Sequence, residues 1–275
     1  MSATDRAARR DERAVSGARR GAVERSLHII EILIEAAAPM SIADIASAAG
    51  LKPNSAHRLL QKLADIGYVY RNELTKRVCA GPQALYPKSL HHPLNRLRQE
   101  AREQLRALRE RYDESVCLIV FVGHERIIID AIQGREPLSP LYETRLRNPL
   151  HASAAGIILL NELSSKQRRR LLGEEPFKAS TVNTVTGYAM LESQFEALQR
   201  QGYAVARETA FIGVNAVAAP IRSDRKAIGC IAITGSSQTI TEERLGGFGE
   251  ALRHSADLIS CGAPSVKAVA HFLGA

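Results

Sequence analysis

The amino-acid sequence predicts an α+β protein with an N-terminal winged helix–turn–helix and a C-terminal domain built on a mostly antiparallel sheet. Two amphipathic helices joined by a glycine turn occupy residues 41–69, and short β-prone runs follow them directly. From residue 115 the pattern changes to β-branched strands. With 275 residues, the chain is long enough for two domains with separate cores.

Residues 1–22 are rich in Arg, Ala, Ser, Asp and Gly and lack hydrophobic periodicity, so we expect a disordered basic arm. The arm either keeps the chain soluble or contacts DNA, and its candidate contacts are Arg9, Arg10, Arg13, Arg19 and Arg20. A first helix is expected over residues 23–37, before Pro39. Its inward residues are predicted to be Leu27, Ile30, Leu33 and Ile34.

The helix–turn–helix begins at Ser41, a good N-cap, with Asp44 in the capping-box position three residues later. Gly50 stands where a helix C-cap needs a left-handed residue. Pro53 suits the first position of the second helix, where its missing N–H is not needed. The two helices are therefore predicted to meet at a tight turn.

The second helix has an apolar face and a donor-rich, basic face. Ala56, Leu59, Leu60 and Leu63 share the apolar side, and no carboxylate appears on the other side before Asp65. Such a helix enters a DNA major groove, although an ordinary helical hairpin with a polar side in water is the alternative. The candidate DNA-binding residues of this region are Lys52, Asn54, Ser55, His57, Arg58 and Lys62.

A two-stranded wing is expected after the second helix. Residues 68–70 and 76–80 are β-prone, and a polar turn separates them. Arg71, Lys76 and Arg77 lie near the expected tip, where cations contact the phosphate backbone without reading sequence.

A long amphipathic helix is predicted from Leu94 to Tyr112. Its apolar stripe runs through Leu97, Ala101, Leu105 and Leu108, with many Arg and Glu residues around it. The stripe packs either on a partner copy or on the helix's own domain. The preceding pair His91-His92 points in two directions, which does not favour a shared metal.

The C-terminal domain is expected to have the order β-β-α-β-β-β-α. A glycine turn at Gly123 separates the first two strands, and an apolar helix follows residues 149–156. Further strands are expected near residues 203–208, 215–222 and 227–234, and a final helix at 241–260 starting with a capping box of Thr241 and Arg244.

Composition favours an intracellular, nucleic-acid-binding protein. The net charge is +8, and residues 1–92 hold 14 Lys and Arg against nine Asp and Glu. We expect a cytoplasmic location because no secretory signal, membrane span or paired cysteines appear. Cys79, Cys117, Cys230 and Cys261 are expected to be buried thiols, and no pattern indicates a metal or a cofactor.

An enzyme is not indicated. The chain has no GxSxG elbow, HExxH helix or phosphate-binding loop. His151 precedes a helix without an acid beside it, which suits packing or ligand orientation.

Several motifs in order resemble the IclR family of bacterial transcription regulators over about residues 23–260. They are RSLHIIEIL, SIADIASAAGL, AHRLLQKLADIGYV, AGPQAL, PLHASAAG, QGYAVARET, GVNAVAAPI, IAITG and TEERL. The resemblance implies a winged helix, a linker helix and a GAF-like effector domain with an antiparallel sheet and flanking helices. It also implies dimers, often paired into tetramers, on palindromic operators near metabolic genes. We expect the boundaries 1–22, 23–86, 87–112, 113–262 and a C-terminal tail at 263–275.

The resemblance also implies an effector site at the start of the helix after PLHAS. Backbone N–H groups of Ala154 and Ala155 would hold an organic acid, since a helix N-terminus favours a carboxylate. Polar residues frequent in the family are replaced here by Ala206, Ala216 and Ala232, and Thr234 keeps a hydroxyl. The remaining candidates are His151 and Ser153, with Tyr142, Phe211 and Ile212 as walls.

We therefore expect a ligand-responsive DNA-binding regulator whose effector is a carboxylate with an apolar or aromatic body rather than a two- or three-carbon keto acid. Repression is expected rather than activation because an autoregulating repressor is the simplest circuit, although activators share the fold. The alternative is an architectural or constitutive DNA-binding protein with a vestigial pocket. The second domain argues against it, because duplex compaction needs no second core.

Overall fold

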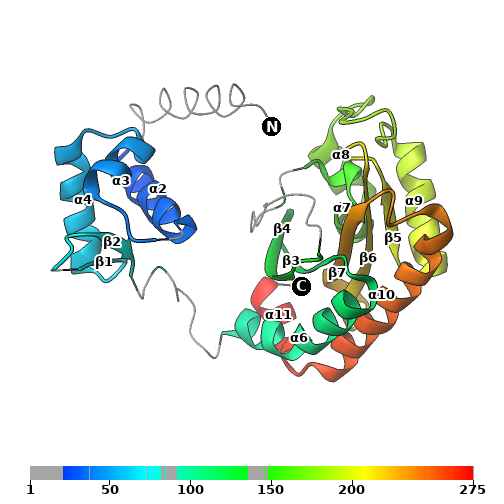
Figure 1. Cartoon of the computed structure of the whole chain (residues 1–275). Coiled ribbons are helices and arrows are strands. Elements are labelled where there is room, and N and C mark those ends of the chain that lie inside the picture. The colour runs from blue at the N-terminus through cyan, green and yellow to red at the C-terminus, as the bar shows by residue number, and fades with distance from the viewer. Residues whose placement is uncertain are drawn as a thin grey trace. The chain divides into compact units, whose positions relative to one another are not determined.

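The computed structural model describes residues 21–36, 38–72, 74–81, 84, 92–135, 146 and 148–274 (Figure 1). Most of the predicted basic arm, His91 and Tyr142 lie outside these residues. The chain divides into two compact units, residues 1–89 and residues 90–275. Each unit has a core of its own.

The N-terminal unit is a winged helix–turn–helix. Helices α2 (Ala22–Glu35), α3 (Ile42–Ala49) and α4 (Pro53–Asp65) precede the strands β1 (Val69–Arg71) and β2 (Val78–Ala80). The strands pair antiparallel, with Tyr70 opposite Cys79. The core contains residues from all five elements, among them Ile29, Ile45, Leu60, Val69 and Val78.

The ends of the two central helices form as the sequence predicts. The Oγ atom of Ser41 accepts from the backbone N–H of Asp44 at 3.1 Å, and the Asp44 carboxylate accepts from the Ser41 backbone N–H at 3.3 Å. Hydrogen bonds to Ser41 lower the pKa of Asp44. Gly50 closes α3 with a φ of 65°, and α4 begins at Pro53. Local sequence therefore determines this turn.

The inward face of α2 differs from the prediction. Ile29 and Leu33 are buried, whereas Leu27 and Ile34 are 56% and 49% exposed. The expected inward set of Leu27, Ile30, Leu33 and Ile34 was therefore partly wrong. The apolar residues of α2 form two stripes, and α3 and α4 cover only the one that contains Ile29 and Leu33.

The C-terminal unit contains a five-stranded sheet in which every neighbouring pair is antiparallel. The strands are β3 (Ser115–Val122), β4 (Glu125–Ile132), β5 (Ala204–Arg207), β6 (Val214–Ser223) and β7 (Lys226–Ser236). Their order across the sheet is β4-β3-β7-β6-β5. The predicted hairpin between β3 and β4 turns at Gly123, whose φ is 59°. These pairings confirm the mostly antiparallel sheet.

Helices cover both faces of this sheet (Figure 1). Helices α6 (Pro93–Tyr112), α10 (Glu242–Gly262) and α11 (Ser265–Leu273) share one hydrophobic core with the first face. The other face packs against α7 (Ala154–Asn161) and α9 (Tyr188–Gln201), with η1 (Leu150–Ala152) and α8 (Ser165–Leu172) on that side. Successive residues of β3 enter opposite cores, as Leu118 and Ile119 show. The unit therefore has three layers.

The predicted linker helix is α6, and its apolar stripe packs on its own unit. Leu97, Ala101 and Leu105 are almost fully buried in the core beneath the sheet. Of the two packing alternatives, the structure supports the one without a partner copy. His92 is the N-cap of this helix, and its Nδ1 atom accepts from the Leu94 backbone N–H at 3.3 Å.

The C-terminal residues also depart from prediction. The stretch expected as a tail, 263–275, contains α11, which buries Val266 and Val269 against α6 and the sheet. Ser265 donates to Glu100 of α6 from both its backbone and its hydroxyl. Thr241 precedes α10 without a side-chain cap, and Arg244 donates to the Thr239 carbonyl, so the expected capping box was wrong. Arginine has no acceptor for the Thr241 N–H.

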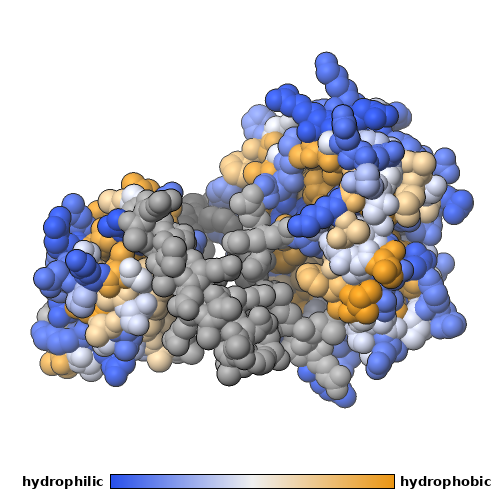
Figure 2. Space-filling view, turned by 90° about the horizontal axis from the view of Figure 1, so that it is seen from above, coloured by the Kyte–Doolittle hydropathy of each residue, from blue (hydrophilic) through white to orange (hydrophobic). Residues whose placement is uncertain are grey.

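Hydrophilic side chains dominate the surface in Figure 2, and apolar groups interrupt them on both units. Within the described ranges, no helix is long and apolar enough to cross a membrane. The same residues contain no cluster of three or more His, Cys, Asp or Glu side chains suited to a metal ion.

Candidate functional site

The exposed face of α4 collects the predicted DNA-binding side chains. Ala56, Leu60 and Leu63 are buried against the N-terminal unit, which fixes the rotation of the helix. Its opposite face is consequently directed to solvent, and it carries Asn54, Ser55, His57, Arg58 and Lys62 after the N-cap residue Lys52. All of these are exposed except Ser55, which is half-buried. The arrangement suits insertion into a major groove.

The wing cations differ from one another in their surroundings. Lys76 is exposed in the turn, with a positive φ of 55°. Arg77 is exposed but donates to the Pro39 carbonyl at 3.0 Å, which ties the wing to the segment before α3. Arg71 is half-buried at the end of β1, and its Nε atom is buried without a partner. The structure therefore does not gather all three cations at one exposed tip.

The predicted effector residues on the sheet do lie together. Ala206 of β5 pairs with Ala216 of β6, and Ala216 pairs with Thr234 of β7. In the next row Ala218 pairs with Ala232. These residues share the face toward α7. The alanines among them, Ala206, Ala216, Ala218 and Ala232, pack in one core with α7. Their small side chains allow the helix to approach the sheet closely.

The first turn of α7 stands above this face. Ser153 is the N-cap, and its Oγ atom accepts from the Gly156 backbone N–H at 3.1 Å. Ala154 and Ala155 occupy the first two helical positions, where a helix provides no acceptor for the backbone N–H. Position 156 requires glycine, because the Cβ of any other residue would lie 2.0 Å from the Leu150 carbonyl oxygen. This turn therefore presents donors at a helix N-terminus.

Arg126 is a site residue that the sequence interpretation missed. It lies at the start of β4, is only 2% exposed, and its Nη1 atom donates to the Ser153 hydroxyl. Its Nη2 atom donates to the Leu146 carbonyl at 3.2 Å and to the Asn148 carbonyl. Burial lowers the pKa of Arg126 to about 10, chiefly by desolvation. An arginine at the head of the run RIIIDAI was the available signal.

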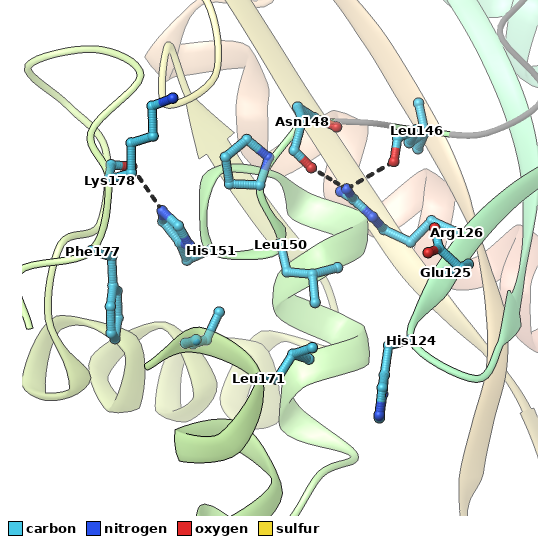
Figure 3. Close-up of a pocket in the computed structure, with 12 residues that line it drawn as sticks. His124, Glu125, Arg126, Leu146, Asn148, Leu150, His151, Leu171, Phe177 and Lys178 are labelled. Carbon is cyan, nitrogen blue, oxygen red and sulfur yellow. Dashed lines mark hydrogen bonds between the residues drawn. The ribbon is translucent and has the colours of Figure 1, made fainter. Parts of the chain in front are cut away.

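An open cavity of about 700 Å³ lies beside this arginine (Figure 3). Arg126 and His151 line it, and Leu150, Leu171 and Phe177 supply much of its apolar wall. The Nε2 atom of His151 is 3.1 Å from the Lys178 carbonyl, and its ring lies 5.2 Å from Phe177. His151 is 7% exposed, and its Nδ1 atom is buried without a partner.

Two predicted pocket walls lie elsewhere. Phe211 and Ile212 are 59% and 64% exposed on the loop between β5 and β6, which does not fit walls of a closed cavity. Of the predicted effector residues that the structure describes, only His151 lines the open cavity, and Ser153 accepts a hydrogen bond from the cavity residue Arg126. The alanines belong instead to the packed core described above.

Comparison with known proteins finds the same family for both units. The family profile described as "Bacterial transcriptional regulator IclR C-terminal" matches residues 91–261, and that described as "IclR helix-turn-helix domain" matches residues 22–73. The probable transcriptional regulator SauR of Cupriavidus necator is 29% identical over 252 residues, covering 86% of this chain and 94% of SauR. The transcriptional repressor IclR of Escherichia coli is 28% identical over 228 residues, covering 82% and 83%.

Solved structures agree with the fold. The Thermotoga maritima IclR has a TM-score of 0.71 at 25% identity, covering 86% of this chain and 96% of that one. An IclR homologue from Microbacterium hydrocarbonoxydans, complexed with 4-hydroxybenzoate, has a TM-score of 0.70 at 24% identity, covering 90% and 100%.

A winged helix–turn–helix joined to a separate sheet domain, with relatives that are all regulators, defines a DNA-binding transcriptional regulator and not an enzyme. The chain belongs to the IclR family of bacterial transcriptional regulators, since the C-terminal profile alone covers more than half of it.

Proposed function

We propose that this chain is a homodimeric, ligand-responsive repressor of metabolic genes that senses an organic acid with an apolar or aromatic body. The observation that carries the proposal is the combination, in one chain, of a helix suited to a DNA groove and a separate unit whose helix α7 has Ala154 and Ala155 at its first two positions, where backbone N–H groups favour an anion. Repression is proposed because several relatives, such as the IclR of Escherichia coli, are repressors.

The chemistry of the C-terminal unit supports this ligand class. A carboxylate suits the first turn of α7 because backbone N–H groups and the helix dipole both favour negative charge. The surrounding sheet positions Ala206, Ala216 and Ala232 offer methyl groups, and Thr234 is their polar neighbour. A homologue of the same fold was crystallised with 4-hydroxybenzoate, an aromatic acid.

A second copy of the chain is proposed as the partner of α2. Val23, Leu27 and Ile34 are 73%, 56% and 49% exposed and recur at intervals of four and seven residues. Apolar residues at that spacing are typical of a helix that packs on another helix. Pairing through this stripe would present two α4 helices to the half-sites of a palindromic operator.

Ligand control requires that the ligand bind one arrangement of the protein more tightly than another. Because α6 is buried in the C-terminal unit, a change in that unit moves α6 with it. We propose that α6 transmits the ligand signal toward the DNA-binding unit.

Fluorescence anisotropy tests the proposal directly. The full chain is titrated onto DNA from upstream of its own gene and onto random duplex, with benzoate, 4-hydroxybenzoate or pyruvate. We expect tighter binding to the upstream DNA, changed by an aromatic acid. Equal, salt-sensitive binding to both duplexes that no acid changes would support the architectural alternative, and tight pyruvate binding would contradict the ligand class.

A further inference from the structure

Arg126 is a positive charge in the interior of the C-terminal unit. Its side chain is 98% buried, because its exposed fraction is 2%. Burial lowers its pKa to about 10, yet it remains protonated at neutral pH. Arginines are almost never fully buried unless an opposite charge accompanies them. The surroundings of this guanidinium therefore require an explanation.

The groups that accept from Arg126 are all uncharged. They are the Ser153 hydroxyl and the backbone carbonyls of Leu146 and Asn148, and the Nε atom is buried without a partner. Glu125, the acid among the cavity residues, attracts the charge from a distance. Figure 3 shows the guanidinium directed toward Leu146 and Asn148 and away from Glu125. Among the described residues, no carboxylate contacts it.

The neighbouring cavity has matching features. It is lined by the buried Arg126, by His151 with a partnerless Nδ1 atom, and by apolar side chains of η1, α8 and the loop before α9. Because the Lys178 carbonyl can only accept, the Nε2 atom of His151 donates to it, and Nδ1 has no partner among the described residues. A few polar groups in a partly apolar cavity are typical of a ligand site.

We propose that Arg126 is the anion-recognising residue of this cavity, pairing with the carboxylate of an organic acid whose apolar part contacts Leu150, Leu171 and Phe177. This inference rests on the proposed function for the class of ligand, and it adds the residue and the place. Since Arg126 donates to Ser153, the N-cap of α7, the proposed anion site lies beside the start of that helix. The ligand would bring a carboxylate into contact with the guanidinium, which no described residue does.

Thermal unfolding of the full chain with benzoate as the probe tests the assignment. Benzoate should raise the Tm of the wild type at constant ionic strength, and benzamide, which has the same shape without the charge, should not. In Arg126→Met the affinity for benzoate should fall about 10- to 100-fold, because a charge-assisted hydrogen bond is lost. The proposal is overturned if benzoate leaves the wild-type Tm unchanged or stabilises both proteins equally.

Arg102→Met is the matched control. Arg102 of α6 pairs with Asp130 of β4 at 3.0 Å, so its removal also takes away an arginine that contacts β4, and benzoate binding should persist. If Arg126→Met does not fold, Arg126→Gln decides, since glutamine keeps a hydrogen-bond donor but lacks the charge. Undiminished benzoate binding by Arg126→Gln would then overturn the proposal.

The anisotropy experiment separates this inference from the proposed function. If benzoate binds through Arg126 but changes no DNA affinity, the site stands and ligand-responsive regulation fails. If another acid changes DNA affinity equally in the wild type and Arg126→Met, the regulation stands and the assignment of Arg126 fails.

Discussion

Tyr112, the last residue of α6, stacks on Phe248 of α10 with ring centroids 4.2 Å apart and an interplanar angle of 29°. Its hydroxyl also donates to the Gly247 carbonyl at 2.9 Å. The C-terminal end of α6 is thus fixed to α10 within the C-terminal unit.

Tyr112→Phe should remove the hydroxyl contact alone and lower the free energy of unfolding of the C-terminal unit by about 0.5–1.5 kcal/mol. Tyr112→Ala should lower it by more than about 2 kcal/mol, because the ring stack is lost as well. Denaturant unfolding followed by circular dichroism measures both. Equal losses in the two variants would show that the ring contributes little.

Replacing two glycines by alanine should change the free energy of unfolding in opposite directions. Gly50 closes α3 in the left-handed region, so Gly50→Ala should destabilise the N-terminal unit by about 1 kcal/mol. Gly246 lies inside α10 with open space where a Cβ would stand, so Gly246→Ala should stabilise the protein by up to about 1 kcal/mol. Thermal unfolding distinguishes these, and a loss at both sites would contradict the helix assignment of Gly246.

If Arg58 contacts a base, Arg58→Ala should weaken binding to the upstream DNA by about 1–3 kcal/mol. Binding of the variant to random duplex should then be almost unchanged. If Arg58 holds only phosphate, both duplexes should weaken alike and the salt slope should fall by about one. Anisotropy titrations at several salt concentrations separate the two roles. Arg207→Ala is the control and should leave DNA affinity unchanged, because Arg207 lies in the C-terminal unit, where it pairs with Glu242 at the surface.

The thiols should differ in reactivity with pH. Burial raises the pKa of Cys117 to about 11 and raises that of the fully buried Cys230 as well, so both remain protonated at pH 8. Since the thiolate is the reactive form, iodoacetamide at pH 8 should modify the exposed Cys261 first and spare these two until the protein unfolds. Raising the pH toward 9.5 should increase Cys117 labelling only slightly, because the pH stays below its pKa. Mass spectrometry of the digested protein gives the order, and rapid labelling of Cys230 in the folded chain would contradict its burial.

The exposed stripe of α2 predicts an effect on assembly. Leu27→Glu should weaken self-association of the chain, since a carboxylate at a helix–helix contact loses its water. Leu74→Glu, at a wing residue that is 94% exposed, should leave the oligomeric state unchanged. Sedimentation velocity over a range of concentrations gives both answers. Identical behaviour of Leu27→Glu and the wild type would exclude α2 from the interface.

Local sequence signals were sufficient where short-range physics decides the structure. Ser41, Gly50 and Pro53 each have a backbone role that few residues fill, and the helix–turn–helix follows from them. Runs of β-branched residues likewise placed β3 and β4, and strand pairing in the structure puts Ala206, Ala216 and Thr234 side by side on one face.

Long-range packing decided the rest. The burial of α6 on its own unit depends on α10 and α11, which lie more than a hundred residues away, and α11 carries no distinctive start signal. From the sequence, Arg126 is only the polar end of a strand, because the tertiary fold alone brings Ser153 and the carbonyls of Leu146 and Asn148 around it. Buried charge cannot be read from one strand.

The alanine rows of the sheet have a practical consequence for engineered biosensors. Ala206, Ala216 and Ala232 lie on adjacent strands, and each is a side chain to which a serine hydroxyl adds only one atom. A combinatorial library at these three codons would therefore vary polarity beside α7 with little change in volume. Screened with a fluorescent reporter gene, it would show how much polarity the packed core between the sheet and α7 tolerates before regulation is lost, which limits how far the regulator can be altered as a sensor.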